Sequence, residues 1–327
     1  MIVYHDAYNF DLDDLLGNWD MYMGVGLTSP YDTQRYRTIH QFLRSQGCET
    51  YFTQPQPITE DILRLVHPES YLNTLHHSEE LARIYESPIL SRIPYEQIKR
   101  YVINSVFLAI GGTILATQIA MREGWAINLS GGYHHAKTEE GRGSCPYSDI
   151  GVTIRKIWED QPYTKIMIVD LDAHQGNGYA EIFLHEHRVS IFDVYNENKY
   201  PIMFVEDVVL RDRINFNHPV QSGIDDATYM GILHQHLPGA VTDIRPDLII
   251  YNAGYDTIET DPYGGMKLTP NGICQRDEYV FKIAKQNKVP IVMLISGGYS
   301  SEGTATAGKS ILNIIKNKEG KKECCIM

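Results

Sequence analysis

Cysteine and positive charge are both scarce in this sequence. Its five cysteines form no C-x-x-C pair, and 29 lysines and arginines stand against 41 aspartates and glutamates. The cysteine spacing argues against a disulfide framework and favours a reducing compartment. The net charge of −12 argues against broad binding to nucleic-acid phosphates, so we expect no direct nucleic-acid partner. The same charge suits a basic partner or substrate.

The N-terminus also lacks the basic-then-apolar pattern of a signal peptide, so we expect no secretion signal. One uncharged stretch, Tyr101–Met121, is long enough to span a bilayer, but its polar residues and paired glycines favour a buried core helix. The 327 residues, 43% of them hydrophobic, suffice for a large core without disulfides. We therefore expect a soluble protein of the cytoplasm, the nucleus or both.

Short apolar runs alternate with longer helical stretches along the chain. The runs are continuously apolar, which is typical of strands covered on both faces, and this predicts one α/β domain with a mainly parallel sheet flanked by helices. The expected strands are 125–129, 165–169, 189–192, 248–251 and 291–295, and the expected helices are 95–123, 149–159, 226–243, 271–286 and 304–315.

Unusual polar residues follow each of the expected strands. Ligands of parallel sheets bind beyond the carboxyl ends of the strands, so we expect these residues at one edge of the sheet. They belong to the segments 130–135, 170–174, 193, 252–256 and 296–299. The sequence thus predicts an active site at this edge.

Asp172 and His174 are separated by one residue at a strand end, so both side chains point to the same side. Asp256 ends another strand and is a candidate third metal ligand. Three protein ligands leave a position for water, as in catalytic zinc sites. The alternative is a strand-end turn capped by carboxylates.

His134 and His135 are adjacent and follow two glycines. Such a pair can accept and deliver protons, and Asp170 and Asn177 are natural partners that would push the two pKa values apart. Tyr299 can donate to a developing oxyanion. The alternatives are a satisfied core histidine pair and a tyrosine packed on a glycine turn.

In this order, the motifs resemble those of the zinc-dependent histone deacetylases of the arginase–deacetylase superfamily, and most closely those of class IV. The matching segments are 125–135, 170–178, 193–196, 251–256 and 295–299. The resemblance covers residues 1–315, which we expect to form the catalytic domain, with 316–327 as a basic tail.

The resemblance implies a Zn²⁺ ion held by Asp172, His174 and Asp256. It also implies that His134 and His135 handle protons while Tyr299 and the zinc stabilise the oxyanion. A structural K⁺ would lie near Asp170, Asp172, His174 and Asp193, and a second one at the carbonyls around Phe183, Glu186 and Val189. Arg35 matches an arginine that some members place in an internal acetate-release channel.

The substrate tunnel departs from the family pattern. Many members have Gly-Phe-Cys where this chain has Gly143, Ser144 and Cys145, so one aromatic wall is missing. The other expected tunnel residues are Tyr200, Tyr263 and Gly298, and Tyr263 stands where relatives usually place leucine or methionine. A reshaped tunnel would admit longer acyl groups; alternatively, Tyr263 refills the space that Ser144 leaves.

The chain ends in Cys324-Cys-Ile-Met327, which fits the C-a-a-X prenylation pattern beside a group of lysines. We expect membrane association only if Cys324 is lipidated. The alternative is an unmodified tail.

These features predict a zinc-dependent hydrolase that removes acetyl or longer acyl groups from lysines of proteins such as histones. A small-molecule amidohydrolase of the acetylpolyamine type ranks lower, because Tyr263 replaces the glutamate expected there. A manganese ureohydrolase would need a further Asp-x-Asp pair near Asp256. An inactive acyl-lysine reader would not need the intact ligands, histidines and Tyr299.

Overall fold

A parallel sheet forms the centre of the computed structural model, which describes residues 1–9, 32–201 and 210–318. Within these residues its eight strands follow the order β2-β1-β3-β8-β7-β4-β5-β6, and every neighbouring pair is parallel. The predicted α/β fold with a mainly parallel sheet is confirmed. The strands are β1 (Ile2–Val3), β2 (Phe52–Thr53), β3 (Trp125–Asn128), β4 (Ile166–Asp170), β5 (Val189–Asn196), β6 (Phe216–Val220), β7 (Leu248–Ala253) and β8 (Ile291–Ile295).

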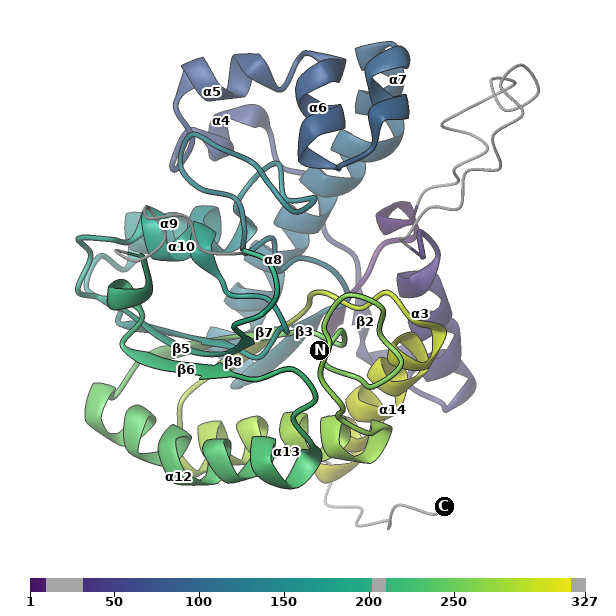
Figure 1. Cartoon of the computed structure of the whole chain (residues 1–327). Coiled ribbons are helices and arrows are strands. Elements are labelled where there is room, and N and C mark those ends of the chain that lie inside the picture. The colour runs from purple at the N-terminus through teal and green to yellow at the C-terminus, as the bar shows by residue number, and fades with distance from the viewer. Residues whose placement is uncertain (10–31, 202–209, 319–327) are drawn as a thin grey trace.

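Helices cover both faces of the sheet (Figure 1). One face carries α3 (Arg35–Ser45), α12 (Asp226–Ile244), α13 (Pro270–Asn287) and α14 (Ser301–Lys318). The other carries α8 (Asn104–Glu123), α9 (Asp149–Asp160) and α10 (Asn177–Ile182). A separate cluster at the top of Figure 1 contains α4 (Glu60–Leu63), α5 (Glu69–Thr74), α6 (Ser78–Ile84) and α7 (Tyr95–Ile98).

Side-chain caps begin the helices that follow the strand-end loops. The Ser148 hydroxyl accepts from the Gly151 N–H at the start of α9, and the Asp225 carboxylate accepts from the Thr228 N–H at the start of α12. Thr269 caps α13, whose first residue is Pro270. These caps fix where each helix leaves the loop edge of the sheet.

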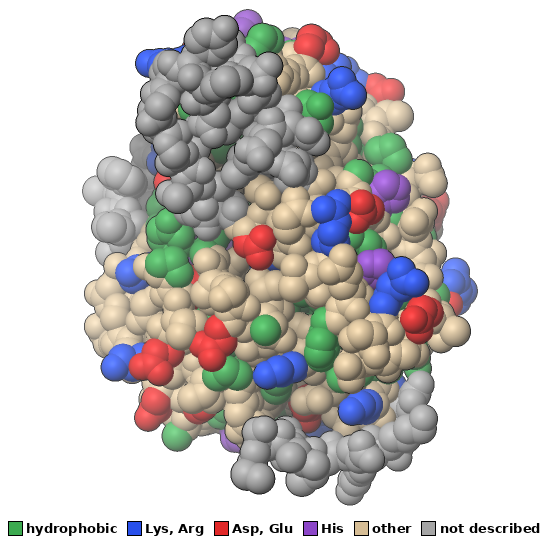
Figure 2. Space-filling view, turned by 90° about the vertical axis from the view of Figure 1, so that its right-hand side faces the viewer, with side chains coloured by type: hydrophobic (Ala, Val, Ile, Leu, Met, Phe, Trp, Pro, Cys, Tyr) green, Lys and Arg blue, Asp and Glu red, His purple; other side chains and the backbone are tan. Residues whose placement is uncertain are grey.

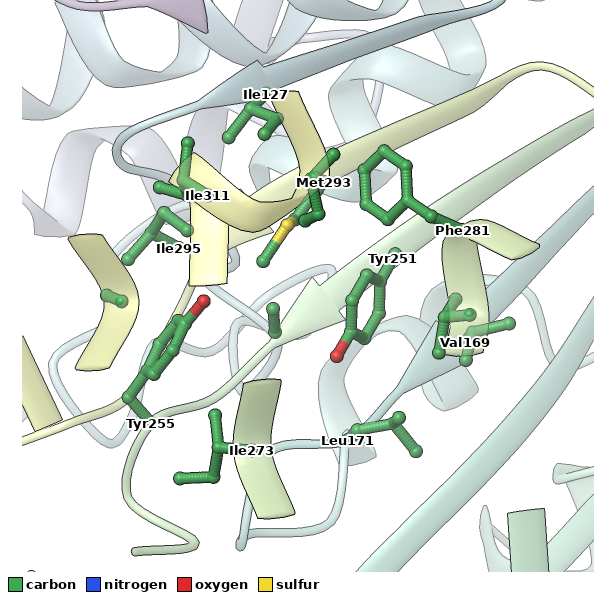
Figure 3. Close-up of a cluster of buried hydrophobic side chains, with 14 of the residues drawn as sticks. Ile127, Val169, Leu171, Tyr251, Tyr255, Ile273, Phe281, Met293, Ile295 and Ile311 are labelled. Atoms are coloured by element: carbon green, nitrogen blue, oxygen red, sulfur yellow. The ribbon is translucent and has the colours of Figure 1, made fainter. Parts of the chain in front are cut away.

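The core between the sheet and α13–α14 is largely apolar. Figure 3 shows Val169, Tyr251 and Met293 of the strands beside Phe281 and Ile311 of the two helices. A buried pair on α13 adds polar groups to this core: Arg276 donates to Asp277, and the Tyr251 hydroxyl also donates to Asp277.

The predicted helix 95–123 is continuous, and within it α7, a π-helical segment (Lys99–Ile103) and α8 follow one another without a break. It is long and apolar enough to cross a membrane, but α8 packs against β3, β8 and α9 and is largely buried in the fold. This confirms the expected core helix. Helix α14 runs on to Lys318, past the expected end at residue 315.

Candidate active site and metal centre

Three predicted metal ligands meet at the carboxyl edge of the sheet. Asp172 and His174 follow β4, Asp256 follows β7, and one ligand atom of each lies within 4.8 Å of the others. His174 Nδ1 lies 3.1 Å from Asp172 Oδ1 and 2.9 Å from Asp256 Oδ2. All three side chains are buried. The strand ends therefore bring together ligands that are far apart in sequence.

Neighbouring groups hold both carboxylates in place. Asp172 Oδ2 accepts from the Ser296 hydroxyl and the Gly297 N–H, each at 2.9 Å. Asp256 Oδ1 accepts from the Ala173 N–H at 2.9 Å. A Cβ at Gly297 would lie 2.4 Å from Asp256 Oδ2, so only glycine fits beside the ligands. The site is preorganised by the loops after β4, β7 and β8.

The electrostatics of the three ligands fit a cation. Burial opposes charging of His174, but Asp172 and Asp256 raise its pKa to about 10. Burial and the Asp172 charge raise the pKa of Asp256 to about 7. One imidazole nitrogen and two carboxylate oxygens are ligands that zinc takes in proteins. The donor set therefore fits Zn²⁺.

The histidine pair follows β3 and lies next to the ligands. His134 Nδ1 lies 2.8 Å from Asp170 Oδ2, and His135 Nδ1 lies 2.9 Å from Asn177 Oδ1. The ring centroids of the two histidines are 4.0 Å apart. The structure thus gives each histidine the partner that the sequence analysis expects.

The partner of His134 is the carboxylate of Asp170 and that of His135 is the neutral amide of Asn177, and the pKa values of the two histidines differ accordingly. Burial opposes charging of His134, but Asp170 and Asp172 raise its pKa to about 9. Burial and then the His134 charge hold the pKa of His135 well below its ordinary value. One histidine thus favours the protonated form and the other the neutral form.

Tyr299 follows β8, and its position depends on a residue that the sequence analysis did not assign. Asp261 accepts from the Tyr299 N–H at 2.7 Å through Oδ2 and from the Tyr263 and Gly264 N–H groups through Oδ1. The Tyr263 ring meets the Tyr299 ring edge-on, with centroids 5.0 Å apart. One buried carboxylate therefore fixes both tyrosine backbones.

A cavity of about 180 Å³ adjoins these groups. Arg35, at the start of α3, lines it and donates to the Ser296 carbonyl at 2.8 Å. Of the expected tunnel residues, Gly143, Ser144 and Gly298 line the cavity. Tyr200 and Tyr263 instead contact the rings of His135 and Tyr299, and the Tyr200 ring centroid lies 4.8 Å from that of His135.

The first expected potassium position has a fitting set of oxygens. Asp170 and Asp193 are register partners on β4 and β5, and both are fully buried. Asp193 Oδ1 is buried without a hydrogen-bond partner among the described residues. Burial and the Asp170 charge raise the pKa of Asp193 well above its ordinary value, and a cation here would favour the ionised carboxylate.

The second expected potassium position does not fit a metal ion. The carbonyls of Phe183, Glu186 and Val189 all accept hydrogen bonds from the guanidinium of Arg213. A positively charged side chain therefore occupies the position where the sequence analysis expects an ion. This was not foreseen from the sequence, because Arg213 lies outside every motif that carried the resemblance.

Arg276 on α13 is another contributor that sequence reasoning missed. It is fully buried, and its Nη1 donates to the carbonyls of Leu171 and Gly254 at 3.0 and 2.7 Å. These carbonyls belong to the loops that carry Asp172 and Asp256. Its Nε donates to Asp277 at 2.9 Å. Arg276 thus links the two loops from its position on α13.

Cys324 and the rest of the C-a-a-X segment lie outside the described residues. Among the described residues, Cys48, Cys145 and Cys274 are buried free thiols. The absence of disulfides among these three agrees with the spacing argument, whereas the lipidation of Cys324 stays a prediction.

The parallel sheet and the ligand set at its carboxyl edge define a hydrolase of the arginase–deacetylase fold. The chain belongs to the histone deacetylase family, whose histone deacetylase domain matches residues 29–315. Histone deacetylase 2 of Arabidopsis thaliana is 36% identical over 315 residues, covering 96% of this chain and 78% of that relative. Histone deacetylase 8 of Xenopus tropicalis is 29% identical over 285 residues, covering 83% of this chain and 75% of that relative.

A solved structure has the same fold. The crystal structure of the HDA15 HD domain superposes with a TM-score of 0.75 and covers 100% of this chain and 90% of that one. Its sequence identity is 19%, so this likeness bears on the fold alone. Family membership supports a deacetylase that hydrolyses amide bonds.

Proposed function

We propose that this protein is a zinc-dependent hydrolase that removes acyl groups from lysine side chains of proteins, histone tails among them. The observation that carries this proposal is the position of the ligand set formed by Asp172, His174 and Asp256 beside both histidines, with Tyr299 lining the same cavity. When bound, the metal supplies a Lewis acid that polarises the amide carbonyl and lowers the pKa of water.

The hydrogen bonds of the two histidines support a different role for each in the proposed reaction. Asn177 Oδ1 accepts from Nδ1 of His135, so the proton sits on Nδ1 and Nε2 is free to take the proton of the attacking water. Asp170 holds Nδ1 of His134 and favours its charged form. A protonated histidine of this pair then delivers a proton to the departing lysine amine.

Tyr299 completes the site through its phenol. The hydroxyl donates to the oxyanion that develops on the substrate carbonyl, and Asp261 fixes the backbone from which the tyrosine projects. This leaves the tyrosine with a role in stabilising charge and the histidines with the proton transfers.

The test is turnover of acetyl-lysine peptides by the zinc-loaded protein. His135→Ala and Tyr299→Phe should each reduce kcat by about 10²- to 10⁴-fold while zinc content stays unchanged. Tyr163→Phe is a matched control, because Tyr163 is 88% exposed and does not line the cavity. Near-normal turnover by either active-site variant would refute the assignment.

The cavity supports acyl groups longer than acetyl. Besides the metal ligands it is lined by the apolar side chains of Val102 and Val106 and by the rings of Tyr85 and Tyr133. Ser144, where many relatives carry phenylalanine, adds no aromatic wall. We expect octanoyl- or myristoyl-lysine peptides to be hydrolysed at least as well as acetyl-lysine peptides of the same sequence. A clear preference for acetyl would remove this part of the proposal.

We also propose that Asp170 and Asp193 help to hold one structural K⁺. The support is the buried, unpartnered Oδ1 of Asp193 next to a second carboxylate. Thermal unfolding in potassium and in choline buffers tests this, since Asp193→Asn should weaken the stabilisation that potassium gives.

A further inference from the structure

Three main-chain carbonyls converge on one side chain at the turn between α10 and β5. Arg213 Nε donates to the Phe183 carbonyl at 2.7 Å, and Nη2 donates to the carbonyls of Glu186 and Val189 at 3.0 and 2.8 Å. Nη1 donates to Asn215 Oδ1 at 3.0 Å. Every nitrogen of the guanidinium therefore has an oxygen partner of good geometry.

A ring of carbonyl oxygens has the chemistry of a monovalent-cation site, since carbonyl dipoles replace the hydration shell of an ion. Here the positive charge is already supplied by a covalently attached group. A guanidinium presents donors in a planar fork and is hydrated more weakly than an ammonium, so it is suited to this partly buried turn. Burial lowers the pKa of Arg213, as expected for a cation drawn out of water.

We infer that Arg213 is a tethered cation that takes the place of a bound monovalent ion at the carbonyls of Phe183, Glu186 and Val189. Folding of this turn then needs no dissolved potassium. This inference rests on the contacts of Arg213 and does not depend on the proposed function.

Because of the position of the turn, Arg213 also contacts the end of the helix that carries Asn177. Phe183 is the C-cap residue that follows the last residue of α10, so the guanidinium interacts favourably with the C-terminal carbonyl end of that helix. The first residue of α10 is Asn177, which holds His135, and the Gly178 N–H donates to the His134 carbonyl at 2.8 Å. Arg213 therefore anchors the far end of the helix that positions the histidine pair.

The experiment compares the wild-type protein with Arg213→Ala in potassium and in choline buffers of equal ionic strength. In choline, the variant should melt below the wild type. Addition of potassium should raise its Tm by at least ~2 °C more than it raises that of the wild type, because the freed carbonyls can take the ion. Low millimolar guanidinium should also raise the Tm of the variant alone.

Arg155→Ala is the matched control. Arg155 packs over the rings of Trp158 and Phe183 in the same corner, at 5.3 and 5.4 Å, so its loss removes packing and charge without freeing the carbonyl ring. It should gain no potassium response. Arg213→Lys keeps a positive charge at the turn, and we expect it to remain less sensitive to potassium than Arg213→Ala.

Counting bound ions gives an independent readout. Thallium(I), used as a potassium substitute, should bind Arg213→Ala at one more position per chain than the wild type. Equal thallium counts, together with equal potassium responses of the two proteins, would overturn the inference. If Arg213→Ala does not fold in choline, recovery of folding in potassium or guanidinium supports it, and failure in both contradicts it.

Discussion

The Asp261 carboxylate positions part of the site through backbone contacts alone. Its two oxygens accept three backbone N–H groups, one of them from Tyr299 and one from Tyr263. An asparagine would keep the shape but turn an NH₂ group toward a backbone N–H. The position therefore requires a carboxylate.

We predict that Asp261→Asn lowers kcat on lysine peptides by about 10- to 100-fold, since a hydrogen bond to a charged group contributes about 1.5–3 kcal/mol. Zinc content should be unchanged, because the displaced group is Tyr299. Steady-state kinetics with metal analysis measures both. Asp160→Asn, at an exposed position, is the control. Unchanged kcat in Asp261→Asn would exclude this positioning role.

His67 is a buried histidine that lies outside the site and has a structural role. Its Nε2 accepts from the Ser148 N–H at 3.0 Å, so its Nδ1 carries the proton and donates to the Thr138 carbonyl at 2.9 Å. Desolvation lowers its pKa to about 4, although the Thr138 contact opposes this. Protonation would break the bond from Ser148.

We predict that His67 makes the folded state less stable in acid. The unfolded chain takes up this proton near pH 6.5 and the folded chain near pH 4, so the full contribution is present above pH 6.5. As the pH falls to 4, the free energy of unfolding should drop by about 3 kcal/mol from this group. In urea unfolding experiments, the free energy of unfolding of His67→Gln should depend less steeply on pH than that of the wild type. The exposed His77→Gln should keep the wild-type slope.

At the scale of elements, strand prediction succeeds where burial is complete. All residues of β4, β5, β7 and β8 are buried. The sequences of β4, β7 and β8 are apolar up to the polar residues at or after their ends, whereas β5 carries Ser190 and Asp193 within the strand. The edge strand β6 was missed because Asn217 and His218 are polar and Pro219 is untypical of a strand. The two-residue strand β1 is too short to give a pattern.

Site prediction succeeds for residues in motifs and fails for those that act from neighbouring helices. Asp172, His174 and Asp256 lie at strand ends, where topology alone brings them together. Arg276 lies inside α13, where an arginine is typical of an exposed helix face, and its contacts to Leu171 and Gly254 are long-range. Such contacts depend on tertiary packing and leave no local pattern.

We predict that Arg276→Met weakens zinc binding by about tenfold or more, because the loops carrying Asp172 and Asp256 lose their shared donor. Zinc dissociation measured with a chromogenic chelator tests this without using activity. Thr257→Val is a milder variant, since Thr257 Oγ1 accepts from the same Nη1 at 3.0 Å. The exposed Arg122→Met is the control. Wild-type zinc dissociation in both Arg276→Met and Thr257→Val would contradict the prediction.

At the scale of the whole molecule, the surface and the interior carry charge differently. Figure 2 shows basic and acidic side chains interspersed over the described part of one face. In the interior, carboxylates concentrate at the carboxyl edge of the sheet, where Asp170, Asp172, Asp193 and Asp256 are all buried. Because these groups come from three strands, the negative site exists only when the sheet has formed. Folding therefore carries the cost of burying them, and cations offset it.

We predict that removal of the metal destabilises the whole domain. An ion that binds only the folded chain adds about 2.7 kcal/mol at a concentration 100 times its Kd. Unfolding with a chelator should therefore occur at lower temperature than unfolding with zinc, and potassium should add a separate, smaller increment. His174→Ala removes one ligand and should abolish the zinc response while leaving the potassium response. A zinc response that persisted in His174→Ala would mean that the stabilising ion binds elsewhere, because the other two ligands alone cannot form the three-ligand site.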